Sequence, residues 1–110
     1  MKKNDIKKIT KVAKGLEWSI KEDNGDFELE KYSPAGQDFN INISADTIEE
    51  FSEKLYERYN DFDASEETYL WLDNTGHGTN GAPYDMKDLY EDMEACQEMI
   101  RELAITIQNI

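Results

Sequence analysis

An apolar stripe in the C-terminal run, residues 84–110, constrains the fold more than any other feature of the sequence. Its members recur at intervals of four, three, four, three and four residues, which places them on one face of a helix. The stripe consists of Leu89, Met93, Cys96, Ile100, Leu103 and Ile107. Pro83 precedes the run, and Asp85 and Asp88 suit the positive end of a helix dipole. We therefore expect a long helix over 84–109, against which the rest of the chain packs.

Residues 16–44 switch to a period of two, which is typical of strands with one buried face. Asn24-Gly25 is the signal for a type I′ hairpin, and Ser33-Pro34-Ala35-Gly36 is a second turn. The apolar positions are Leu16, Trp18, Ile20, Phe27, Leu29, Phe39, Ile41 and Ile43. This pattern predicts a three-stranded antiparallel meander. Its polar face would carry Glu17, Glu28, Glu30, Asn40 and Asn42.

Three further segments complete the expected elements. Residues 1–14 form a basic, lysine-rich helix, and residues 46–62 form a helix that begins with a capping pair, Asp46 and Glu49. Residues 65–72 suit either a short helix or a strand. The helix is favoured because Tyr69, Trp71 and Leu72 would then fill the gap between the sheet and the two main helices.

The length of 110 residues predicts one domain over 1–110. The simplest packing lays the helices on the apolar face of the meander. We therefore predict an α+β fold in which a three-stranded antiparallel meander is covered on one face. The cover would consist of two main helices, a short N-terminal helix and a short connecting helix.

The charge is large and unevenly distributed. The formal net charge is -13, yet residues 1–14 hold six lysines and one acid, which gives them +5 and leaves -18 for the remainder. This excess of acid opposes direct binding to nucleic acid or anionic lipid and favours a basic partner. The N-terminal lysines are interpreted as neutralising part of the acidic body, either in the same chain or in a partner subunit. A homodimer is the form that the second alternative would take.

The sequence contains only weak matches to motifs for catalysis, cofactor binding or metal binding. Gly76-His77-Gly78-Thr79-Asn80-Gly81 matches a dinucleotide-binding pattern, but it is better interpreted as a connecting loop because no secure strand precedes it. His77 is the only histidine, and Cys96 lies on the apolar stripe. We therefore predict no catalytic residue, metal site or cofactor. The lone cysteine and the lack of a long apolar run predict a cytoplasmic protein that does not insert in membranes.

The carboxylates form a second stripe on each main helix. They recur three or four residues apart, so neighbouring Cβ atoms would lie about 5–6 Å apart. Residues 46–110 contain 17 acids and only four basic residues to neutralise them. The C-terminal stripe comprises Asp85, Asp88, Glu91, Asp92, Glu94, Glu98 and Glu102. The residues predicted to contact a partner are Glu49, Glu50, Glu53, Glu57, Asp85, Asp88, Asp92 and Glu98.

Two segments, residues 32–39 (YSPAGQDF) and 81–90 (GAPYDMKDLY), resemble small acidic proteins of phages and mobile elements. In size, charge and fold plan the chain is similar to DNA-mimicking inhibitors of the anti-CRISPR and anti-restriction type. The resemblance implies a non-enzymatic inhibitor in a phage-infected cell that occupies the nucleic-acid-binding surface of a basic host defence nuclease. An RNA-guided nuclease is the candidate target. The alternative is a small self-associating structural or regulatory module of a phage or mobile element.

Overall fold

The computed structural model describes residues 1–75 and 86–110. These residues form one three-stranded antiparallel sheet of order β1-β2-β3 and four helices, which confirms the predicted α+β class. In chain order the elements are α1 (Lys3–Gly15), β1 (Ser19–Asp23), β2 (Asp26–Tyr32), β3 (Asp38–Ser44), α2 (Ile48–Asp61), α3 (Ala64–Thr75) and α4 (Met86–Gln108). The glycine motif at 76–81, His77 and Asp85 lie outside the described residues.

The elements follow the expected pattern with shifted ends. The ambiguous segment 65–72 belongs to the helix α3, so the helical alternative is the one that forms. Its Thr68 is buried and donates a hydrogen bond to the carbonyl oxygen of Ala64 at 2.7 Å. Tyr69 was expected to fill a gap in the core, but 60% of it is exposed, so that expectation is wrong. Thr68 takes the inward position on α3, and Tyr69, one residue further around the helix, is turned outward.

The sheet places its apolar residues on one face through strict alternation. Phe27 pairs with Ile43, Leu29 pairs with Ile41, and all four side chains are buried. The β1–β2 turn is built on Asn24 and Gly25, whose φ angles of 50° and 87° fit the predicted type I′ hairpin. A Cβ on Gly25 would also lie 2.9 Å from the Ala45 carbonyl oxygen, so this position requires glycine for two reasons.

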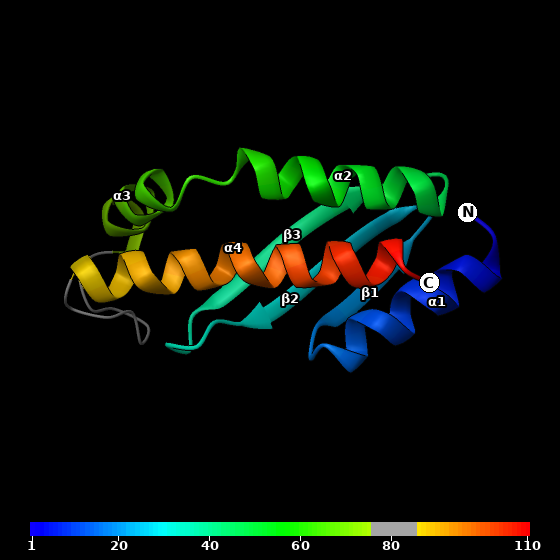
Figure 1. Ribbon diagram of the computed structural model, residues 1–110, viewed down its shortest axis with the longest axis horizontal. Coiled ribbons are helices and arrows are strands. Elements are labelled where there is room, and N and C mark those ends of the chain that lie inside the picture. The colour runs from blue at the N-terminus through cyan, green and yellow to red at the C-terminus, as the bar shows by residue number, and fades with distance from the viewer. Residues whose placement is uncertain (76–85) are drawn as a thin grey trace.

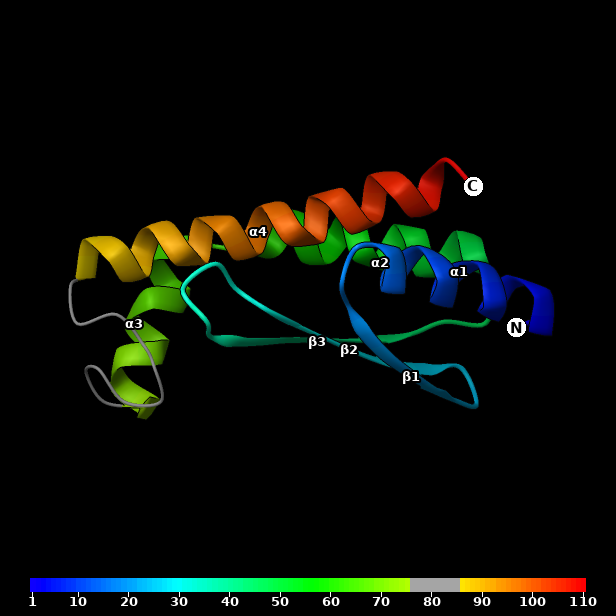
Figure 2. The ribbon, with the colours of Figure 1, turned by 90° about the horizontal axis from the view of Figure 1, so that it is seen from below.

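α1, α2 and α4 cover the apolar face of the sheet (Figure 1), and no described helix crosses the opposite face (Figure 2). The connecting helix α3 was expected in this cover, but it lies beyond the end of the sheet and packs on α4. α2 and α4 run antiparallel, and α2 lies beside the C-terminal half of α4 (Figure 1). The Tyr56 hydroxyl donates to Gln108 Oε1 at 2.6 Å, and Gln97 Nε2 donates to the carbonyl oxygens of Tyr59 and Phe62 at 3.2 Å each. Between the layers, the rings of Phe27 and Phe51 meet edge to face at 4.8 Å.

The long helix is also joined to the sheet by a buried carboxylate. Asp92 is 5% exposed, and its Oδ2 accepts hydrogen bonds from Ser33 Oγ and Gln37 Nε2, both at 2.5 Å. Its Oδ1 accepts a hydrogen bond from the backbone N–H of Ala35 at 2.9 Å. Ser33 and Gln37 are themselves buried, so the carboxylate satisfies polar groups that have lost contact with water. Asp92 therefore holds the β2–β3 turn against α4.

Replacing Asp92 tests this anchor. Asp92→Ala should lower the free energy of unfolding by about 3 kcal/mol, because each hydrogen bond to a charged group contributes roughly 1.5–3 kcal/mol and the three bonds are coupled. Urea unfolding followed by circular dichroism measures the loss. Glu94→Ala, on the solvent side of the same helix and without an ion pair among the described residues, is the matched control and should change stability by less than about 0.5 kcal/mol. Equal stability of the two variants would contradict an anchoring role.

Candidate functional site

The solvent side of α2 carries a row of three carboxylates, the α2 crest: Glu49, Glu53 and Glu57. All three are exposed, because the opposite side of α2 buries Phe51 and Leu55 against the sheet. Successive members are four residues apart, which leaves about 5–6 Å between their Cβ atoms. Among the described side chains none of the three has an ion-pair partner. The α2 crest is therefore an array of unneutralised negative charge.

Glu50, predicted to belong to the same surface, is engaged in the start of α2 instead. Its Oε1 accepts a hydrogen bond from the Asp46 N–H at 3.2 Å and lies 3.7 Å from Lys54 Nζ. Thr47, with φ of -136°, is the N-cap, and its side chain accepts a bond from the Glu50 N–H at 3.1 Å. The predicted capping pair of Asp46 and Glu49 is therefore wrong by one residue. The extended backbone at Thr47 delays the helix, so Thr47 and Glu50 take the capping roles.

A second row of exposed carboxylates follows α4. This α4 crest consists of Glu91, Glu94, Glu98 and Glu102. Two of its members have basic neighbours, since Glu91 lies 3.9 Å from Lys87 and Glu98 lies 3.6 Å from Arg101. Of the four, sequence reasoning assigned only Glu98 to the site, although the spacing of three, four and four residues identifies the whole row.

The other predicted residues of α4 are Asp88 and Asp92. Asp88 is exposed and lies three residues before Glu91, with which it lines a shallow hollow beside Pro34 and Ala35 of the β2–β3 turn. Asp92 is buried beneath that turn, so its placement on an exposed acidic surface is a correction to the sequence-based prediction. Its carboxylate oxygens are occupied by donors from the turn, which leaves it no free face for a partner.

The lysines of α1 point away from the body of the protein. Ile9 and Ala13 are fully buried and attach α1 to the other elements. All six N-terminal lysines are exposed: Lys2, Lys3, Lys7, Lys8, Lys11 and Lys14. None of them forms an ion pair with a carboxylate among the described residues. The predicted neutralisation within one chain therefore does not occur through direct ion pairs, and the positive charge of α1 faces outward.

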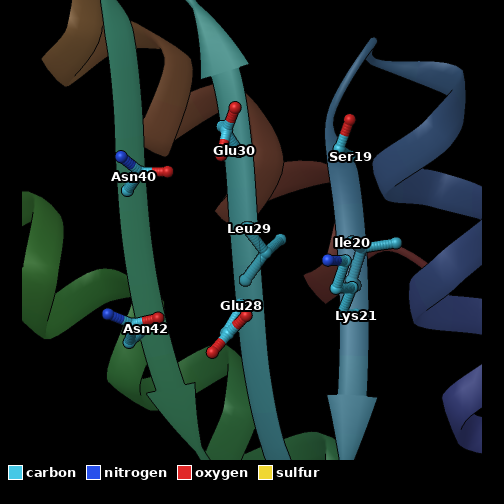
Figure 3. A pocket seen from close by; sticks show the side chains of 8 residues that line it. All are labelled: Ser19, Ile20, Lys21, Glu28, Leu29, Glu30, Asn40 and Asn42. Carbon is cyan, nitrogen blue, oxygen red and sulfur yellow. The ribbon is translucent and has the colours of Figure 1, made fainter.

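The open face of the sheet is a third polar surface (Figure 3). Cross-strand rows place Lys21, Glu28 and Asn42 side by side, and next to them Ser19, Glu30 and Asn40. Together with Ile20 and Leu29 they line a hollow of about 380 Å³. The pKa of Glu30 is raised, first by a hydrogen bond with the Asp38 side chain and then by the charge of Asp38. The carboxyl groups of Glu30 and Asp38 therefore lie close together.

Cys96 is a packed side chain on the buried face of α4, with 1% of it exposed. Burial raises the pKa of its thiol from 9.0 to about 12, with smaller contributions from the charges of Asp92 and Glu67. The thiolate is the nucleophilic form of cysteine, so this position suppresses thiol reactivity at neutral pH.

The raised pKa of Cys96 predicts a pH dependence of stability. A thiol whose pKa is higher in the folded state contributes stability that is complete below pH 9.0 and lost as the pH rises through about 12. We expect the natural chain to lose stability across this interval more steeply than Cys96→Ala, which lacks the ionising group. Urea unfolding at a series of pH values measures both chains, and parallel pH profiles would contradict the assignment.

Within the described residues, no group of three or more histidine, cysteine, aspartate and glutamate side chains could hold a metal ion. No helix there has the length and apolar character that crossing a membrane requires. Comparisons with protein-family models, with curated proteins and with solved structures found no match for this chain. The charged surfaces are therefore the features from which a function can be inferred.

Proposed function

We propose that this protein is a non-enzymatic inhibitor that occupies the nucleic-acid-binding groove of a basic protein. A host defence nuclease of the RNA-guided type is the candidate target. The observation that carries the proposal is the unneutralised row of carboxylates on the α2 crest, extended by the α4 crest on the same helical layer. A protein that grips phosphates with lysine and arginine would bind such a row for the same electrostatic reason.

The two crests continue one another along the molecule instead of lying in parallel. The hydrogen bonds from Tyr56 to Gln108 and from Gln97 to the carbonyl oxygens of Tyr59 and Phe62 set the end of α2 beside the C-terminal half of α4. Along the helix axes, the α2 crest therefore starts near the level at which the α4 crest ends. With a rise of about 1.5 Å per residue, the two crests together place seven carboxylates along about 30 Å of helix. One nucleic-acid strand carries a phosphate about every 3.4 Å, or roughly nine over that length, and a duplex about twice as many.

The number of carboxylates on the two crests, compared with the number of phosphates over the same length, indicates which kind of groove the crests would fit. Seven carboxylates, two of them with basic neighbours on α4, come closer to the roughly nine phosphates of one strand than to the roughly eighteen of a duplex. The proposed target surface is therefore a channel that holds a single strand. The net charge of -13 also supports a basic partner in place of direct binding to nucleic acid.

Charge reversal on the α2 crest tests the proposal. Glu53→Lys/Glu57→Lys should weaken binding to a purified RNA-guided nuclease by about 2–5 kcal/mol for each carboxylate that is fully desolvated in the complex. The free energy of unfolding should change by at most about 1 kcal/mol, because the exposed carboxylates have no ion pairs to lose. Titration at two salt concentrations, with and without a single-stranded DNA competitor, measures the affinity.

The open face of the sheet provides a matched control. Glu28→Lys/Glu30→Lys makes the same change in net charge on the other side of the molecule, and it should leave affinity nearly unchanged. If the sheet variant lost binding while the α2 variant kept it, the sheet would be the contact surface. Binding that ignored both salt and DNA would exclude strand mimicry.

A further inference from the structure

The large apolar side chains that remain exposed gather mainly at one end of the described structure. Tyr69 and Leu70 on α3 are 60% and 45% exposed, and Met86 and Tyr90 at the start of α4 are 48% and 37% exposed. We call this the acidic end, because the surrounding residues Asp63, Glu66, Glu67, Asp88 and Glu91 outnumber the one lysine there, Lys87. Lys87 itself lies close to Glu91.

The opposite end of the long axis combines an apolar groove with unpaired lysines. The groove, of about 450 Å³, lies between α1 and the end of α4, and Val12, Leu16 and Ile110 supply its apolar surface. Lys8 and Lys11 stand at its rim, exposed and without an ion pair among the described residues. We call this the basic end. α1 lies there and α3 lies at the other end, as both views show (Figures 1 and 2).

The two ends are complementary in the arrangement of charge and apolar surface. On α3, Glu66 is three and four residues before Tyr69 and Leu70, so a carboxylate adjoins an apolar pair on one helix face. On α1, Lys8 is three and four residues before Lys11 and Val12, so ammonium groups adjoin the apolar groove in the same way. An apolar ridge bordered by acids therefore matches an apolar groove bordered by lysines.

We propose that the acidic end of one copy of this chain docks in the groove at the basic end of a second copy. Burial of the Tyr69–Leu70 ridge against Val12, Leu16 and Ile110 supplies the apolar contact, and Lys8 and Lys11 pair with the acids of α3. The proposal does not depend on the inhibitory function, since the lysines pair with the acids of α3 and only Glu91 of the α4 crest borders the acidic end.

A second copy fits the basic end better than a nucleic acid does. α1 contains no arginine and no aromatic residue to stack on a base, and an apolar groove offers nothing to a phosphate. The remainder of the chain, at -18, would also repel a polyanion. The partner that satisfies both the lysines and the groove is an acidic surface with exposed apolar side chains, which this chain itself presents.

The contact joins two different surfaces, so it is heterologous. The two ends are separated along a molecule whose longest extent is 44 Å, so one chain cannot satisfy its own groove. Two variants that each lack one end therefore provide a sharp test. Lys8→Glu/Lys11→Glu removes the basic end, and Tyr69→Ser/Leu70→Ser removes the apolar ridge of the acidic end.

Sedimentation velocity over a concentration series measures the association. We expect the natural chain to self-associate, and each variant alone to require at least about tenfold higher concentration. An equimolar mixture of the two variants should recover association but stop at two chains, because each pair retains a single intact contact. Both variants should fold, because the substituted side chains are exposed. Circular dichroism and thermal melts check this.

Lys2→Glu/Lys3→Glu is the control. It makes the same change in net charge at the start of α1, outside the groove, and should associate nearly as strongly as the natural chain. A natural chain that stays monomeric at every concentration would overturn the proposal, as would a mixture of folded variants that fails to associate. Equal loss in the control would reduce the effect to net charge and overturn the groove contact. A short DNA duplex serves as a further probe, and its binding through Lys8 and Lys11 by a monomeric chain would assign these lysines to nucleic acid instead.

Discussion

The hydrogen bonds of Asp92 to the β2–β3 turn fix where the longest helix lies on the sheet. Apolar packing is non-directional and would tolerate a small slide or rotation of α4 over the apolar face of the sheet. Three hydrogen bonds from one turn to one carboxylate tolerate neither, because their strength falls steeply with distance and angle. Every surface that α4 presents, from the acidic end through the α4 crest to the groove beside α1, inherits its position from this contact.

The class of the fold was predictable because two periodicities, near 3.6 and 2, dominate most of the chain. The alternation of Phe27 and Leu29 and the stripe from Leu89 to Ile107 each leave one arrangement that buries the apolar face. The burial of Asp92 was not predicted, because an aspartate on a helix is usually exposed and its spacing relative to the apolar stripe was not used. It lies three residues after Leu89 and four before Cys96, on the buried face, so the spacing alone would have placed it in the core.

The outward orientation of the lysines on α1 could not be predicted from the composition. Opposite net charges in two parts of a chain suggest that the parts neutralise each other, but the orientation of a helix follows its apolar face. Ile9 and Ala13 turn α1 so that they are buried, and the lysines on the other side point to solvent. Burying the lysines would cost more free energy than most surface ion pairs return. The orientation of α1 is therefore set by the burial of its apolar face and not by ion pairs of its lysines. The exposure of Tyr69 has a similar origin, since Thr68 takes the inward position on α3.

The α2 crest lies apart from both ends, and the α4 crest shares only Glu91 with the acidic end, so end-to-end association and binding through the crests are compatible. Copies joined from acidic end to basic end would leave each crest free and would repeat the line of seven carboxylates along the assembly. Once one copy is bound in a basic channel, the copy docked on it is held close to the channel. Its effective concentration there is set by the contact between the two copies and not by the protein concentration in solution. Affinity for a long channel would then rise with protein concentration, whereas affinity for a short one would not. Salt would act at both levels, since it screens the crests and the lysine-bordered contact alike. The steepness of the salt dependence would therefore report how many copies take part in inhibition.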